Sequence, residues 1–109
     1  MTEDEEIMSI ETGSELDIRV ANEFMSGALK NYSKDISAAW QVVKKLEALD
    51  WRVDIITSNE RKSVYALKMV NGAPHTLHFK FGYPMDFSSI PEGICKVSLL
   101  TLIIERNGW

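Results

Sequence analysis

The chain has 109 residues, of which 45% are hydrophobic and 26% charged, and its formal net charge is −4. This length and composition are typical of one globular domain with a packed core, and they exclude two stable domains or a disordered chain. The single cysteine, Cys95, excludes an internal disulfide and a multi-cysteine zinc site, and it favours a reducing, cytoplasmic setting.

Residues 1–13 are predicted to form an acidic, loosely ordered leader that ends at Gly13. A secretory signal would instead be basic and then apolar, and no later run is apolar over a membrane-spanning length. We therefore expect neither secretion nor membrane insertion. Residues 14–109 are expected to form the single folded domain.

The first helix of that domain is predicted from Glu15 to about Met25. Ser14 is a favourable N-cap, and acidic residues in the first turn interact favourably with the positive end of a helix. Apolar residues recur at helical spacing along the segment, and Ser26-Gly27 is expected to end it.

A second helix is predicted to begin at Ser33, which is a favourable N-cap, with the Asp35 carboxylate in the first turn. The same carboxylate argues against an anion site at this helix start, because it competes for the free backbone amides. The apolar positions are expected to form one core-facing stripe, with Trp40 as its largest anchor. That stripe comprises Ile36, Ala39, Trp40, Val43, Leu46 and Leu49.

Three strands are predicted next, because the apolar period changes from helical spacing to alternation at Trp51. Asn71-Gly72 is a strong signal for a hairpin turn between the second and third strands. A meander of antiparallel strands is the simplest arrangement of these segments. The residues expected to share one face within each strand are Trp51, Val53 and Ile55; Tyr65, Leu67 and Met69; and Leu77, Phe79 and Phe81.

The last helix is predicted to begin at Ser89, because Ser89-Ile90-Pro91-Glu92 combines an S-x-x-E capping box with a proline in the first turn. It is expected to run to Asn107-Gly108, and its wide apolar face predicts a central position or a partner. The run VSLLTLII fits a buried strand equally well by propensity, and the cap at Ser89 decides for a helix. The whole order is α-α-β-β-β-α, which indicates a single α+β domain with a three-stranded antiparallel meander sheet packed with helices.

Three segments resemble a family of small phage and prophage proteins, the phage ABA sandwich domain. The family pattern is similar to LD..VA..VM, then YS.DI.AAW.VV.KL, then P..IC.A.L, and this chain has LDIRVANEFM, YSKDISAAWQVVKKL and PEGICKVSLL. Family members often continue the first motif with Met-Gly-Trp, whereas this chain has Met25-Ser26-Gly27, so no role of that tryptophan carries over. The resemblance implies an alpha-beta-alpha sandwich and a phage protein in the cytoplasm of a bacterial host, and it brings no catalytic set and no cofactor.

The residues provide no strong metal or catalytic motif. His75 and His78 are three apart on a predicted strand, which places them on opposite faces without a supporting carboxylate or thiol. Cys95 is expected to be a small buried residue rather than a reactive thiol. An enzyme would need carboxylates from different elements to converge, and the ones to examine are Asp54, Asp86 and Glu92. We therefore expect no enzyme, no metal and no cofactor.

Nucleic acid is also disfavoured as a partner. The acidic residues at the start of the chain leave a nearly neutral body, whereas nucleic-acid binding usually requires clustered Lys and Arg. The order α-β-β-β-α is shared with double-stranded RNA-binding domains, but the last predicted helix begins with only one basic residue, Lys96.

Two hypotheses for function remain. The first is binding of a host or phage protein, or of a second copy, through aromatic and sulfur-containing side chains that are hard to bury together. Its candidate residues are Tyr83, Met85, Phe87 and Trp109. The second is a cleft that holds a small molecule of the nucleotide type. Its candidate residues are Tyr32, Asp35, His78 and Lys80.

Overall fold

The computed structural model describes residues 1–109 and contains five helices and a three-stranded antiparallel sheet in the order β1-β2-β3. This α+β architecture confirms the fold class predicted from the sequence. In chain order the elements are α1 (Glu3–Ser9), α2 (Ser14–Glu23), α3 (Ile36–Ala48), β1 (Arg52–Thr57), β2 (Lys62–Val70), β3 (Ala73–Thr76), α4 (Leu77–Phe81) and α5 (Ile90–Asn107).

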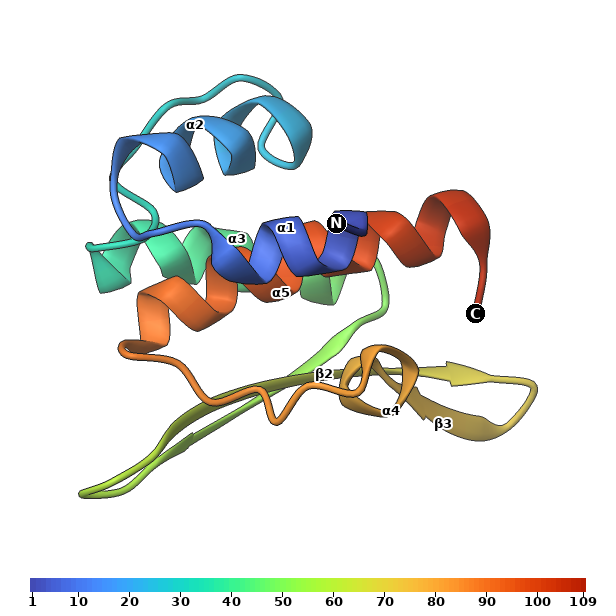
Figure 1. Cartoon of the computed structure of the whole chain (residues 1–109). Coiled ribbons are helices and arrows are strands. Elements are labelled where there is room, and N and C mark those ends of the chain that lie inside the picture. The colour runs from blue at the N-terminus through green and yellow to red at the C-terminus, as the bar shows by residue number, and fades with distance from the viewer.

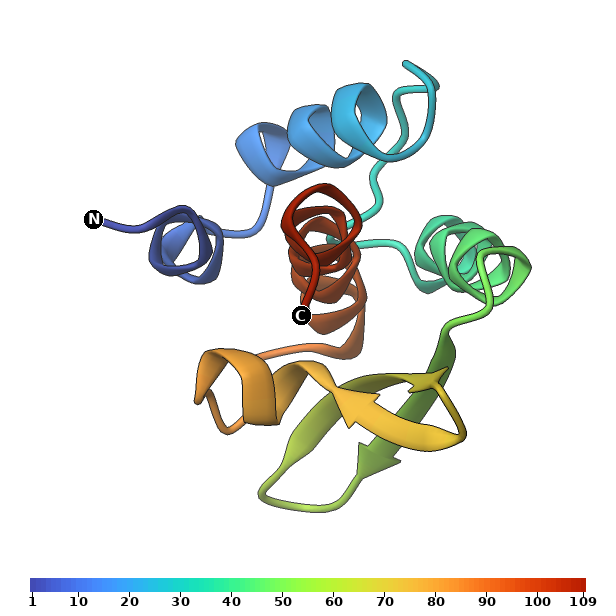
Figure 2. The same ribbon diagram turned by 90° about the vertical axis from the view of Figure 1, so that its right-hand side faces the viewer.

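Helix α5 is the central element of the fold. Figures 1 and 2 show it between the sheet on one side and α2 on the other, with α1 and α3 flanking it on opposite sides. Residues 92–101 of α5 are all buried, and the Ser89 hydroxyl oxygen accepts a hydrogen bond from the Glu92 amide at 3.2 Å. The structure therefore confirms a helix, rather than a strand, at VSLLTLII and its central position. None of the helices combines the length and apolar character needed to cross a membrane.

The N-terminal segment differs from the prediction of a loosely ordered leader over residues 1–13, because it contains helix α1. Thr2 and Glu5 form a reciprocal capping box, and the Ile7 side chain is only 1% exposed against α5. The Lys96 ammonium of α5 donates to the Met8 carbonyl oxygen at 2.8 Å. The partners that order α1 lie far away in the sequence, so the acidic composition alone did not reveal them.

The two long strands pair so that one face of the sheet packs against the helices. Val53 lies opposite Ala66 and Ile55 lies opposite Val64, which places these four side chains on the core face. Trp51 is buried beside them, as predicted. In β2, Tyr65, Leu67 and Met69 share one face, as predicted. That face is the outer one, because small buried side chains are needed where α5 approaches the strand.

The third predicted strand is interrupted by a helical turn. The Asn71-Gly72 turn forms as predicted and β3 ends at Thr76, but residues Leu77–Phe81 form helix α4, and Phe79 is 84% exposed. The chain then returns to the edge of β2, where the Val64 amide donates to the Met85 carbonyl oxygen at 3.2 Å. Alternating apolar residues predicted a continuous strand here. The structure differs because the segment turns Leu77 into the core before pairing resumes.

Helix α3 buries only part of the predicted stripe: Ala39, Val43 and Leu46 are buried as predicted, but Ile36, Trp40 and Leu49 are exposed. The N-cap is Asp35, whose side chain accepts from the Ser37 amide, rather than Ser33. Trp40 is 47% exposed and Ile36 is 51% exposed, so Trp40 is not the core anchor of the helix. Ala38 and Val42 complete the buried stripe, which comprises Ala38, Ala39, Val42, Val43 and Leu46.

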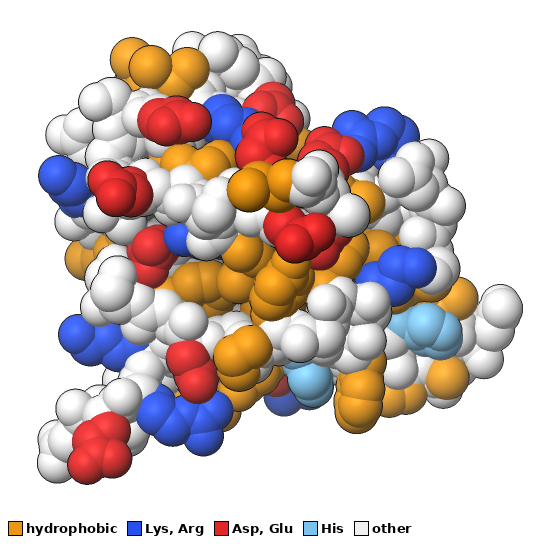
Figure 3. Space-filling view, in the orientation of Figure 1, with side chains coloured by type: hydrophobic (Ala, Val, Ile, Leu, Met, Phe, Trp, Pro, Cys, Tyr) orange, Lys and Arg blue, Asp and Glu red, His pale blue; other side chains and the backbone are white.

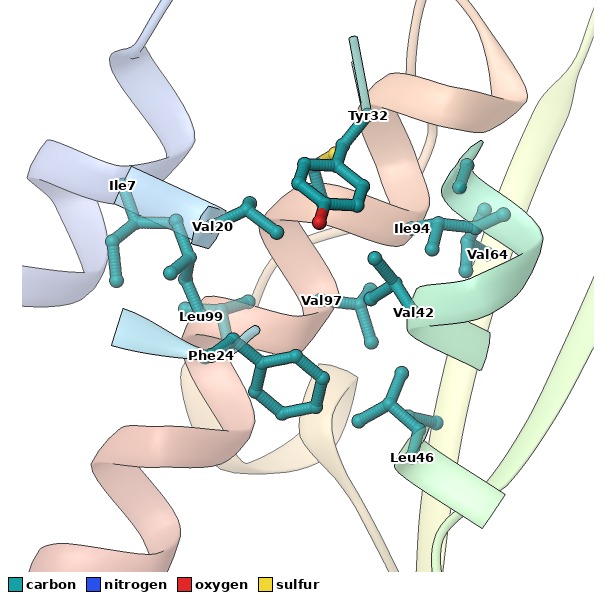
Figure 4. Close-up of a cluster of buried hydrophobic side chains, with 14 of the residues drawn as sticks. Ile7, Val20, Phe24, Tyr32, Val42, Leu46, Val64, Ile94, Val97 and Leu99 are labelled. Atoms are coloured by element: carbon teal, nitrogen blue, oxygen red, sulfur yellow. The ribbon is translucent and has the colours of Figure 1, made fainter. Parts of the chain in front are cut away.

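The choice of stripe on α3 follows from how closely α3 approaches α5. Figure 4 shows Val42 and Leu46 directed toward α5, near Val97. Two small alanines in the buried stripe allow a close approach of the helices, which a core-facing tryptophan would prevent. Each buried aliphatic side chain contributes roughly 1.5–3 kcal/mol relative to exposure. The remaining apolar residues of α3 are therefore left on its outer face.

Candidate functional site

The loop predicted to bind a partner does not form an exposed patch. Met85 is 1% exposed, and Tyr83 and Phe87 are partly buried against the core. The Tyr83 hydroxyl donates to the Asp4 carboxylate at 2.9 Å, and burial together with this hydrogen bond raises the pKa of Tyr83 to about 12. The prediction that these side chains are hard to bury together is wrong, because helix α1 and the edge of β2 cover them.

Trp109, the fourth predicted partner-binding residue, lies apart from that loop in an aromatic cluster. Its ring centroid is 5.7 Å from that of Trp51 and 5.2 Å from that of His75. Lys68 lies over the Trp51 ring at 5.2 Å and pairs with Glu105 at 2.9 Å. This cluster holds the end of α5 against the sheet.

The residues predicted to line a small-molecule cleft are not brought together. Tyr32 is fully buried among α2, α3 and α5, where its hydroxyl donates to the Ala28 carbonyl oxygen (Figure 4). Asp35 caps α3, whereas His78 and Lys80 belong to α4 at the sheet. Lys80 donates to the Trp109 carbonyl oxygen. The prediction of one cleft from these four residues is therefore wrong, because two of them are used by the core and by a helix cap.

The remaining titratable residues are divided among separate local interactions. Asp54 pairs with Arg52 at 3.2 Å, and Asp86 accepts from Ser63 and Arg61, which lowers the pKa of Asp86. Glu92 forms a buried ion pair with Lys96 of the same helix, so these three carboxylates do not surround one pocket. No three His, Cys, Asp or Glu side chains converge as a metal site would require.

Cys95 is buried in α5, as predicted. Its side chain is inaccessible, and burial raises the pKa of the thiol, with Asp17 and Glu92 adding to the effect. A neutral, inaccessible thiol is not a nucleophile at neutral pH.

The surface that sequence reasoning missed lies on the outer face of α3. An open hollow of about 300 Å³ is lined by Ile36, Ser37 and Trp40, and we call it the Trp40 surface. The residues Ile36 and Trp40 are one helical turn apart, so their side chains lie side by side. The sequence does contain a signal for this surface. A second apolar stripe on α3, made of two alanines, two valines and a leucine, is able to face the core and so leave Trp40 exposed.

A second hollow, of about 360 Å³, lies between β3, α4 and the end of the chain. We call it the β3–α4 groove, and it contains Lys80 and Trp109 from the two predicted sets. The Thr76 hydroxyl is buried without a hydrogen-bond partner. The groove is lined by Pro74, His75, Thr76, Phe79, Lys80 and Trp109.

Comparisons with known proteins give one positive result. A family profile described as phage ABA sandwich domain matches residues 5–99. This match begins within α1 and extends into α5, so it includes every strand and the Trp40 surface. Comparison with curated proteins and with solved structures gave no match. Because the profile covers most of the folded chain, the protein belongs to the phage ABA sandwich domain family.

Proposed function

We propose that this phage-associated protein acts by binding another protein, rather than by catalysis, and that the partner docks on the Trp40 surface. The observation that supports this proposal is the exposure of Trp40 and Ile36 together on the rigid helix α3. Tryptophan is enriched among the residues that contribute most to protein interfaces, because it covers a large area at low conformational cost. A partner that covers this exposed apolar pair removes its surface from water, which favours binding.

The expected result for Trp40→Ala is loss of the partner with little loss of stability, because the side chain does not pack in the core. Tagged wild-type and variant chains are used as bait in a lysate of phage-infected host cells. Any protein retained by the wild type and lost from Trp40→Ala is a candidate partner. Light scattering over a range of concentrations shows whether the partner is a second copy.

Phe79→Ala is the matched control for this experiment. Phe79 is a large aromatic residue that is 84% exposed, and it lies on α4 outside the Trp40 surface. The control variant should retain the same proteins as the wild type. Equal retention by wild type and Trp40→Ala, or equal loss from both variants, would contradict a specific role for the Trp40 surface.

A second candidate function is binding of a small molecule of the nucleotide type in the β3–α4 groove. The observation that favours it is the unpartnered Thr76 hydroxyl beside the Phe79 and Trp109 rings, since a planar ligand can stack on aromatic side chains and accept from a hydroxyl.

Saturating nucleotide is then expected to raise the melting temperature of the wild type, because a ligand that binds only the folded state stabilises it. The shift in melting temperature should be reduced in Phe79→Ala and unchanged in Trp40→Ala. In this experiment Phe79→Ala is therefore the test variant and Trp40→Ala is the control. Absence of a shift across a nucleotide panel would rule out this candidate.

A further inference from the structure

Most Lys and Arg side chains of the molecule contact an oxygen atom of the same chain, and the two without such a contact lie at the Trp40 surface. The chain has 12 Lys and Arg residues. Six of them form ion pairs within the chain, namely Arg19, Arg52, Arg61, Lys68, Lys96 and Arg106. Four more donate hydrogen bonds to main-chain or side-chain amide oxygens, namely Lys30, Lys45, Lys62 and Lys80.

The two that remain, Lys34 and Lys44, flank the apolar pair on α3. Lys34 precedes the first turn of the helix, and Lys44 is one turn beyond Trp40 on the same exposed face. Lys30, whose ammonium contacts the Gln41 side chain at 2.7 Å, adds a third positive charge beside this face. The Trp40 surface is therefore an apolar patch between two free ammonium groups.

Neither ammonium group forms an ion pair within the chain. Figure 3 shows acidic side chains gathered over α1 and α2, and Figure 2 shows α1 and α3 on opposite sides of α5. Within α1, Glu3 pairs with Arg106 and Glu6 pairs with Arg19. On α3 itself, Glu47 is the only carboxylate beyond the cap, and although it lies one turn after Lys44 it forms no ion pair with it.

We infer that the Trp40 surface recognises an acidic amphipathic helix of another protein, with an apolar anchor flanked by carboxylates. This inference rests on the proposed function of the Trp40 surface and adds the chemistry of the partner. The apolar anchor fills the hollow between Ile36 and Trp40, and the carboxylates pair with Lys34 and Lys44. Lys34 and Lys44 are ten positions apart, or about 15 Å at the rise of a helix. Carboxylates about three turns apart on the partner helix match that spacing.

Binding of a labelled synthetic helix tests the inference directly. Fluorescence anisotropy is measured with an acidic amphipathic peptide that carries one tryptophan or leucine anchor and glutamates three turns apart. A second peptide has the same apolar residues with lysines in place of the glutamates. The wild-type chain should bind the acidic peptide at least about tenfold more tightly than the basic one, and the affinity should fall with added salt.

A charge-reversal variant supplies the decisive comparison. Lys34→Glu/Lys44→Glu should lose at least about tenfold in affinity for the acidic peptide and gain affinity for the basic one. Lys62→Glu, which reverses an exposed lysine on the sheet, should bind both peptides as the wild type does. Equal binding of the two peptides, no binding of the acidic one, or tighter binding of single-stranded DNA than of the acidic peptide would each overturn the inference.

The lysate experiment separates failure of this inference from failure of the proposed function. If Trp40→Ala loses the captured protein while Lys34→Glu/Lys44→Glu retains it, the Trp40 surface is a docking site and the acidic partner is wrong. If neither variant affects capture, both proposals fail. Loss of capture in both variants, with retention in Lys62→Glu, supports both.

Discussion

Replacement of Gly93 by alanine is expected to lower the free energy of unfolding by about 3 kcal/mol, the upper range for overpacking a core. In an exposed helix the same change stabilises by up to about 1 kcal/mol, because alanine is the better helix former. Here a Cβ atom would lie 2.6 Å from the Phe87 ring and 2.6 Å from the Val64 side chain. Gly93 is thus the residue that lets α5 approach β2.

The sign of the change makes this prediction easy to test by urea unfolding, since propensity and packing predict opposite effects. A double-mutant cycle with Val64→Ala provides the control, because shortening Val64 relieves part of the clash. The double variant should therefore be less destabilised than the sum of the two single variants. A stabilised Gly93→Ala chain would show that α5 does not approach the sheet as closely as described.

Lys96→Met is expected to destabilise the chain by roughly 3 kcal/mol at neutral pH, as for other buried ion pairs that lose one partner. The Lys96 ammonium and the Glu92 carboxylate are 3.1 Å apart with almost no exposure, and Lys96 also holds the Met8 carbonyl oxygen. Methionine fills a similar volume but leaves Glu92 charged and buried. It also detaches the end of α1 from α5.

The loss of stability in Lys96→Met should depend on pH, and the protonation of Glu92 decides whether the loss grows or shrinks as the pH falls. Burial alone would raise the pKa of Glu92, but hydrogen bonds from Ser88 and Lys96 outweigh it and hold the pKa below 4.5. A lowered folded-state pKa stabilises the wild type above pH 4.5, and this contribution is lost as the pH falls through the folded-state value. In the variant the penalty should shrink below that pH, because Glu92 is then protonated.

Urea unfolding of both chains well above and well below pH 4.5 measures this dependence. Arg19→Met is the matched control, because Arg19 and Glu23 have the same spacing on α2 but Glu23 is more exposed. Arg19→Met should lower the free energy of unfolding by less than about 1 kcal/mol. A penalty in Lys96→Met that does not change with pH would mean that the Glu92 charge is not the cause.

The exposure of Ile36 and Trp40 could not be predicted from the sequence, because it depends on which of two overlapping stripes the helix buries. On α3, a stripe with Trp40 and a stripe with Val42 both satisfy helical spacing. Hydrophobicity favoured the stripe with the larger side chain, whereas the distance available between α3 and α5 favoured the smaller one. The same reasoning applies to β2, where Tyr65 and Leu67 have larger side chains than Val64 and Ala66 but lie on the outer face.

By itself the sequence determined what local chemistry controls: α2, α3, β1, β2 and α5, the Asn71-Gly72 turn, the cap at Ser89 and the family motifs. Only the tertiary structure decided the order in α1, the helical turn α4, the buried faces of α3 and β2, and the burial of Met85. Each of these depends on atoms contributed by residues distant in the sequence, such as Lys96 for α1 and β2 for Met85. Local propensity cannot encode such contacts, because they exist only after the chain has packed.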